Sequence, residues 1–270
     1  MTSTSTRPSG STRESARPAV FEHPLSERIR SFLRLENVLA DARQRVGHPE
    51  PAISRAALGS VLELASLAER GDLKRELLAE LERQRIVLSH LRDAAQVDTR
   101  KLDDVLGALT REQDAVEAMG ESLGHGLKTN DFLSAVRSRS AIPGGTCSFD
   151  IPSLHCWLTR PAEERQRDLA GWLDQLSPVE RALATILTHT RESAASHTVT
   201  AAGGIYEYTP PSENPPVLLR IFLGTGTRLY PMVSAGRQRV TIQFQRWNGP
   251  LERPVTLRED VSFDLALCRL

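Results

Sequence analysis

The sequence contains one close grouping of side chains that commonly bind metals or act as nucleophiles: Cys147, His155 and Cys156. Zinc usually takes four ligands at recognised spacings, and on a strand the adjacent His155 and Cys156 would point to opposite faces. We therefore predict no metal site. A Cys/His nucleophilic pair is an open alternative, but we expect Cys147 and Cys156 to be small core residues, which is far more common.

Other short catalytic motifs are missing from the sequence. The glycine runs IPGGT and GTGT match neither the phosphate-binding loop nor the dinucleotide fingerprint, because no GK[ST] follows either run. The zinc-protease pattern HExxH, the hydrolase elbow GxSxG and the calcium-binding loop are absent as well. The sequence thus predicts a protein that is not an enzyme and that uses no cofactor.

Arginine is the remaining side chain whose spacing indicates binding chemistry. Arg30 and Arg34 lie four residues apart and share one side of a helix, while Arg237 and Arg239 share one side of a strand. A guanidinium group binds a carboxylate through two parallel N–H bonds, so these pairs indicate a site for an acidic peptide. Ordinary surface solvation explains the same pattern and stays open here.

The bulk composition limits the classes of partner. Thirty-four basic and 34 acidic residues give zero net charge, and aromatic residues make up 5%. Both values argue against a surface built to hold nucleic acid, although a nucleic-acid-binding module that uses clustered arginines remains the alternative. No apolar run approaches the roughly 20 residues that span a bilayer, so we expect no membrane insertion. Three cysteines without paired spacing indicate reduced thiols in the cytoplasm.

The elements that must position these side chains follow from the periodicity of apolar residues, which predicts an α+β protein. Residues 1–20 are rich in Ser, Thr, Arg and Pro and predict a disordered tail. Helical spacing predicts a helical bundle domain over 21–140, whose first helix runs from Phe21 to Arg45. Further helices are predicted over 161–195, packed on or between the domains. Alternating runs between Gly/Pro turns predict a β-rich, antiparallel, sandwich-like domain made of 141–160 and 199–270.

The leucines of one predicted helix form a narrow seam. Leu77, Leu81, Leu88 and Leu91 follow a heptad-like spacing, and Gln84 lies in the same series. A narrow apolar seam suits packing against another helix. The partner helix could belong to the same chain or to a second copy.

Several segments resemble the ZapD family of bacterial cell-division proteins: FEHPLSERIRSFLRLE, ERGDLKRELLAELERQ and above all SAIPGGTCSFDIPSLHCWL. With LYPMVSAGRQRV near the end, the resemblance extends from Phe21 to near Leu270. It implies a helical domain joined to a β domain, and a symmetric homodimer formed mainly through helices. It further implies a cytoplasmic protein at midcell that binds the C-terminal tail of FtsZ and crosslinks FtsZ filaments.

The resemblance also implies a basic pocket for that tail. Carried over by motif, the pocket falls on Arg30, Arg34, Arg70, His155 and Arg239, with Arg237 as a neighbour. Gln243 stands where some relatives have another basic residue, so this side of the pocket departs from the family pattern.

Overall fold

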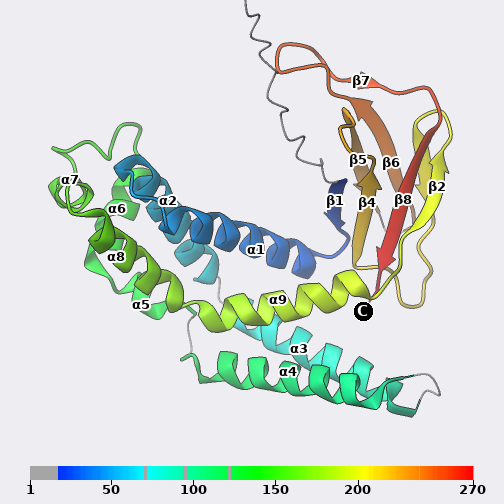
Figure 1. Cartoon of the computed structure of the whole chain (residues 1–270), viewed down its shortest axis with the longest axis horizontal. Coiled ribbons are helices and arrows are strands. Elements are labelled where there is room, and N and C mark those ends of the chain that lie inside the picture. The colour runs from blue at the N-terminus through cyan, green and yellow to red at the C-terminus, as the bar shows by residue number, and fades with distance from the viewer. Residues whose placement is uncertain (1–17, 70–71, 94–96, 121–122, 237, 270) are drawn as a thin grey trace, which may run out of the picture. The chain divides into compact units, whose positions relative to one another are not determined.

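The computed structural model describes residues 18–69, 72–93, 97–120, 123–236 and 238–269. The described residues divide into two compact units: a β unit, which comprises residues 18–25 and Ala194–Arg269, and a helical unit, Ser26–Ser193 (Figure 1). Within the described ranges, no helix is both long and apolar enough to cross a membrane. The predicted α+β class is confirmed.

The helical unit begins where Ser26 caps the first helix by accepting a hydrogen bond from the Ile29 amide. Asp98 and Asn130 cap two later helices in the same way, and proline occupies the first turn of three others. The helices are α1 (Glu27–Val46), α2 (Pro51–Ala68), α3 (Leu73–Ser89), α4 (Thr99–Ala118), α5 (His125–Lys128), α6 (Asp131–Ser140), α7 (Pro152–Leu158), α8 (Ala162–Asp174) and α9 (Ser177–Glu192), with a 3₁₀ turn at His90–Asp93.

Packing in this unit follows the apolar stripe of each helix. On α1 the buried residues recur at intervals of three and four: Ile29, Phe32, Leu35, Val38, Leu39 and Ala42. This stripe lets α1 pack on α2, α8 and α9, while α3 packs on α4 and α9. The predicted seam of α3 buries Leu77, Leu81 and Gln84, but Leu91 lies beyond the helix, in the 3₁₀ turn, and is 43% exposed.

In the described part of the β unit, the strands form two antiparallel sheets. One sheet has the order β1-β4-β8-β2, and the other has the order β3-β6-β5, with β7 paired to β6. The strands are β1 (Ala19–Pro24), β2 (His197–Ala201), β3 (Ile205–Tyr208), β4 (Leu218–Leu223), β5 (Leu229–Ala235), β6 (Val240–Arg246), β7 (Val255–Thr256) and β8 (Val261–Cys268).

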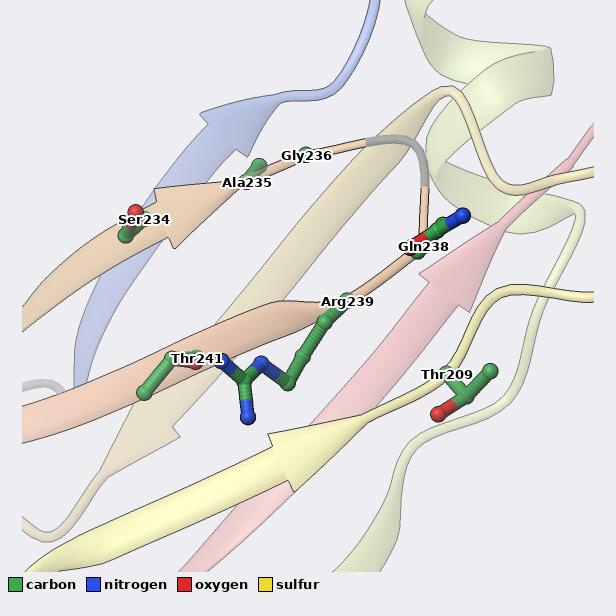
Figure 2. Close-up of a pocket in the computed structure, with 7 residues that line it drawn as sticks. All are labelled: Thr209, Ser234, Ala235, Gly236, Gln238, Arg239 and Thr241. Atoms are coloured by element: carbon green, nitrogen blue, oxygen red, sulfur yellow. The ribbon is translucent and has the colours of Figure 1, made fainter.

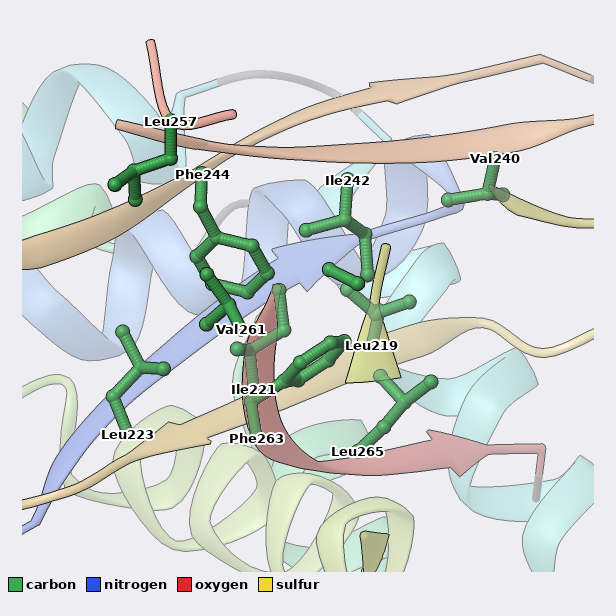
Figure 3. Close-up of a cluster of buried hydrophobic side chains, with 11 residues drawn as sticks. Leu219, Ile221, Leu223, Val240, Ile242, Phe244, Leu257, Val261, Phe263 and Leu265 are labelled. Atoms are coloured by element: carbon green, nitrogen blue, oxygen red, sulfur yellow. The ribbon is translucent and has the colours of Figure 1, made fainter. Parts of the chain in front are cut away.

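Alternating side chains of both sheets form the core of the β unit. Ile221 on β4 and Phe263 and Leu265 on β8 meet Ile242 and Phe244 on β6, and all five are buried (Figure 3). The ring centroids of Phe244 and Phe263 lie 4.9 Å apart. The sheets therefore pack face to face, and the alternation that we expected along β6 and β8 is confirmed.

Two predicted boundaries are wrong. Residues 141–160 form no strands but turns followed by α7, and they belong to the helical unit. Pro152 opens this helix, and Leu154, Trp157 and Leu158 bury one face of it. At the other end, residues 21–24 are not helical but complete β1, which pairs with β4. Of the predicted tail, residues 1–17 lie outside the described residues, and Ala19 and Val20 belong to β1.

Candidate functional site

Arg30 and Arg34 lie one turn apart on α1, as their spacing predicts. Arg30 is partly buried, and its Nε donates to Glu27 Oε1 at 3.1 Å. Arg34 is exposed, and among the described residues no carboxylate pairs with it. Arg34 is therefore the cation of this pair that is more available to an anionic ligand.

A hollow of about 160 Å³ opens beside Arg34. Its apolar lining comes from Leu35 on α1, Leu67 on α2 and Leu73 on α3. Ser31, Asp72 and Glu76 complete it, and Asp72 already pairs with Arg75. The hollow combines an apolar lining with charges of both signs, so it suits a peptide better than a simple anion.

Arg70 lies outside the described residues. In the sequence it stands between Leu67 and Asp72, which both line the hollow beside Arg34. The role of Arg70 in the pocket therefore stays a prediction.

His155 is exposed on α7. The segment before α7 is fixed to the start of α2, because Arg55 Nη1 donates to Thr146 Oγ1 at 3.2 Å. The hollow of Arg34 instead uses the last turn of α2, at Leu67. Twelve residues of helix separate these two ends by about 18 Å. Within the helical unit, α7 lies at the opposite end from the beginning of α1 (Figure 1). The structure of one chain therefore does not bring His155 on α7 together with Arg30 and Arg34 on α1.

Arg239 lies in the β unit, just before β6. Its side chain is exposed, and its Nη1 lies 3.3 Å from Glu207 Oε1 on β3. It contributes to a wide, open hollow with Thr209, Ser234, Ala235, Gly236, Gln238 and Thr241 (Figure 2). Arg237, its predicted neighbour, lies outside the described residues. An exposed ion pair of this kind is weak, so a ligand carboxylate can compete for Arg239.

Gln243 occupies the same face of β6 as Thr241, beyond the hollow of Arg239. In the strand register it stands opposite Ile205 on β3 and Met232 on β5. These neighbours are 42% and 50% exposed. We expected a further basic residue at this position in some relatives. In this chain, Gln243 and the two residues opposite it are uncharged and partly apolar.

The thiol and imidazole grouping gains no support as a metal site. Cys147 and Cys156 are both exposed rather than small core residues, which corrects that expectation. His155 and Cys156 follow one another on a helix rather than on a strand. In the ranges that the structure describes, no cluster of His, Cys, Asp and Glu could hold a metal ion.

Sequence reasoning missed a buried polar network between α1, α3 and α9. Glu80, 2% exposed, accepts hydrogen bonds from Arg28 and Arg83. Gln84 is fully buried and donates to the Ile186 carbonyl at 3.2 Å. Gln84 in the leucine series was the only sequence sign of this network. Glu80 and Gln84 lie inside the unit and join its helices through these hydrogen bonds, so these two side chains are not available to a partner.

Comparisons with known proteins assign the chain to a family. The family model ZapD, described as a cell division protein, matches residues 33–243. The chain is 35% identical to the cell division protein ZapD of Aromatoleum aromaticum over 94% of this chain and 99% of that protein. It is 33% identical to the ZapD of Azoarcus sp. over 93% of this chain and 99% of that protein. The ZapD of Methylococcus capsulatus is 35% identical over 93% of this chain and 98% of its own length. The chain thus belongs to the ZapD family of cell division proteins, as its motifs predict.

Proposed function

We propose that this protein binds the C-terminal tail of FtsZ as a homodimer and thereby crosslinks FtsZ filaments in the cytoplasm, at midcell. Family membership carries the proposal, because the match extends over most of the chain and includes Arg34 and Arg239. Both side chains are exposed and border hollows in the described parts of their units. No enzymatic activity is part of the proposal.

The hollow of Arg34 supports a specific kind of contact. A ligand carboxylate can pair with the guanidinium group while a neighbouring apolar side chain enters the space between Leu35, Leu67 and Leu73. A charge-assisted hydrogen bond contributes roughly 1.5 to 3 kcal/mol when shielded, and much less at a wet rim. Because Asp72 and Glu76 repel further acidic groups, the hollow favours a peptide with few, well-placed carboxylates.

Crosslinking requires two copies of the site in one assembly. A two-fold dimer presents two equivalent sites, and each can hold the tail of a different filament. Each contact can be weak, because the second one forms at a high local concentration and avidity gains of about 10² to 10⁴ are typical. Weak single contacts would also keep the filament bundles dynamic.

A fluorescence titration with labelled FtsZ tail peptide tests the site. We expect Arg34→Ala and Arg239→Ala each to weaken binding by roughly fivefold to a hundredfold, the range of one to three kcal/mol. Arg100→Ala is the matched control, since Arg100 is an exposed arginine on α4 that lines neither hollow. Unchanged affinity in both test variants would overturn the site assignment.

A nucleic-acid module using the same arginines predicts a different result. Arg28, Arg43 and Arg191 pair with carboxylates of other helices, so fewer cations of the helical unit are available to phosphates. A gel-shift assay near physiological salt should therefore show no complex with DNA or RNA.

A further inference from the structure

Helix α2 exposes one continuous side to solvent. The exposed residues recur at intervals of three and four: Ala52, Arg55, Ala56, Gly59, Glu63 and Ser66. Because an α-helix has 3.6 residues per turn, these positions form one stripe centred on Gly59. The opposite side of α2 is buried and includes Leu58, Val61 and Leu64. Apart from Arg55 and Glu63, the stripe consists of small side chains.

No contact within the described chain explains why residue 59 is a glycine. It lies in the middle of α2, where glycine destabilises a helix relative to alanine. A Cβ atom at this position would meet nothing within 4 Å. Packing within the described chain therefore does not require a glycine, whereas the close approach of another backbone does.

Arg55 and Glu63 lie four residues before and after Gly59, and neither finds an opposite charge on its own helix. The positions three and four residues away from each are apolar, small or polar. Among the described residues, the Arg55 side chain donates hydrogen bonds to Thr146 alone, at Thr146 O and Oγ1. Across the described ranges, neither Arg55 nor Glu63 forms an ion pair.

These charges are complementary to their own copy in a second chain. A two-fold axis at Gly59, perpendicular to α2, brings Arg55 of one copy opposite the partner subunit's Glu63, and the reverse. Ala52 then faces the partner's Ser66, so small residues meet small residues along the contact. Two independent features, the charge spacing and the unexplained glycine, thus indicate the same antiparallel arrangement.

We infer that α2 packs antiparallel against α2 of a second copy about a two-fold axis at Gly59. The inference rests on the proposed dimer and names its contact face.

Sedimentation velocity with charge-reversal variants tests this face. Arg55→Glu and Glu63→Arg should each raise the dimer dissociation constant by roughly tenfold or more, because like charges then face each other. The double variant restores opposite charges and should dimerise nearly as the parent does. Asp104→Arg, at an exposed position of α4, is the control and should leave dimerisation unchanged.

The oligomeric state of the parent protein distinguishes failure of the proposed bridging function from failure of the α2 face. A monomeric parent protein at all working concentrations would remove the proposed bridging function and this interface together. A dimeric parent whose single reversals dimerise normally would overturn only the α2 face.

Disulfide trapping provides a second readout. In a background with Cys147→Ser and Cys156→Ser, which removes the exposed thiols, we expect Gly59→Cys to form a covalent dimer under mild copper-catalysed oxidation. A residue on the axis meets its own copy, and a disulfide needs Cα atoms within about 7 Å. Ala118→Cys, exposed on α4, is the matched control. Equal crosslinking of the two variants would contradict the inference.

Discussion

The polar residues of the helical unit serve two separate purposes. Glu80 and Gln84 are buried, and their hydrogen bonds to other helices are satisfied within the unit. A buried carboxylate is costly unless it is paired, and the contacts of Glu80 with Arg28 and Arg83 offset the cost of burying it. Arg34 remains exposed instead. Partner binding is therefore expected from side chains that the fold does not need.

His189 makes the stability of this network depend on pH. Its Nδ1 lies 3.3 Å from Gln84 Oε1, and burial lowers the pKa of His189, with the charge of Glu192 opposing that effect. In the unfolded chain His189 therefore takes up a proton below about pH 6.5, whereas in the folded chain it does so only at a lower pH. The free energy of unfolding therefore has its full value above about pH 6.5. It decreases as the pH falls from there towards the lower pKa of His189 in the folded state.

Urea unfolding between pH 5 and 8 measures this effect. The loss of unfolding free energy on acidification should be smaller in His189→Gln than in the parent, because the variant cannot take up the proton. Exposed His197→Gln is the control and should follow the parent. Identical pH profiles for His189→Gln and the parent would show that His189 does not carry the effect.

At the scale of elements, local patterns predicted most of the fold. The stripe of α1 and the alternation of β6 depend only on neighbouring residues, and both are confirmed. The segment 141–160 was mistaken for strands because its Cys, Phe and Trp content is β-like and α7 is only seven residues long. β1 was missed because its partner, β4, is almost 200 residues away, and no local pattern reveals such a pairing.

The candidate site was predictable to a similar degree. The spacing of Arg30 and Arg34 placed them on one side of a helix, but the hollow beside Arg34 depends on tertiary contacts. Leu67 and Leu73, which line the hollow of Arg34, come from other helices and were not predicted. The use of α2 as a self-complementary face likewise required the burial of every residue along it.

The turn before α7 depends on one glycine. Gly145 is buried, its amide donates to the Ile142 carbonyl at 2.9 Å, and a Cβ atom there would lie 2.5 Å from the Arg139 carbonyl oxygen. Gly145→Ala should therefore destabilise the protein by about 1–3 kcal/mol. Gly171→Ala is the matched control, because Gly171 is exposed on α8 with open space around it. Alanine there should stabilise by about 0.5–1 kcal/mol.

Thermal unfolding of both variants checks this pair. We expect the two melting temperatures to move in opposite directions. A Gly145→Ala variant as stable as the parent would mean that the turn relaxes without cost and does not fix α7.

At the scale of the whole molecule, the residues proposed to bind the tail are divided between two units with separate cores. Arg34 belongs to the helical unit and Arg239 to the β unit. The proposed dimer face, on α2, shares no residue with either hollow. Because these surfaces are distinct, tail binding and filament crosslinking should be separable by substitution.

Co-sedimentation with FtsZ filaments tests that separation. Bundles pellet at low speed, whereas single filaments with bound protein pellet only at high speed. We expect Arg34→Ala to reduce the protein in both pellets. Arg55→Glu should bind filaments in the high-speed pellet but lose bundling, because a monomer holds only one tail. The double variant Arg55→Glu with Glu63→Arg should bundle again, since crosslinking depends on the restored pairing between copies. Bundling by an Arg55→Glu protein that sediments as a monomer would show that one chain suffices to join two filaments.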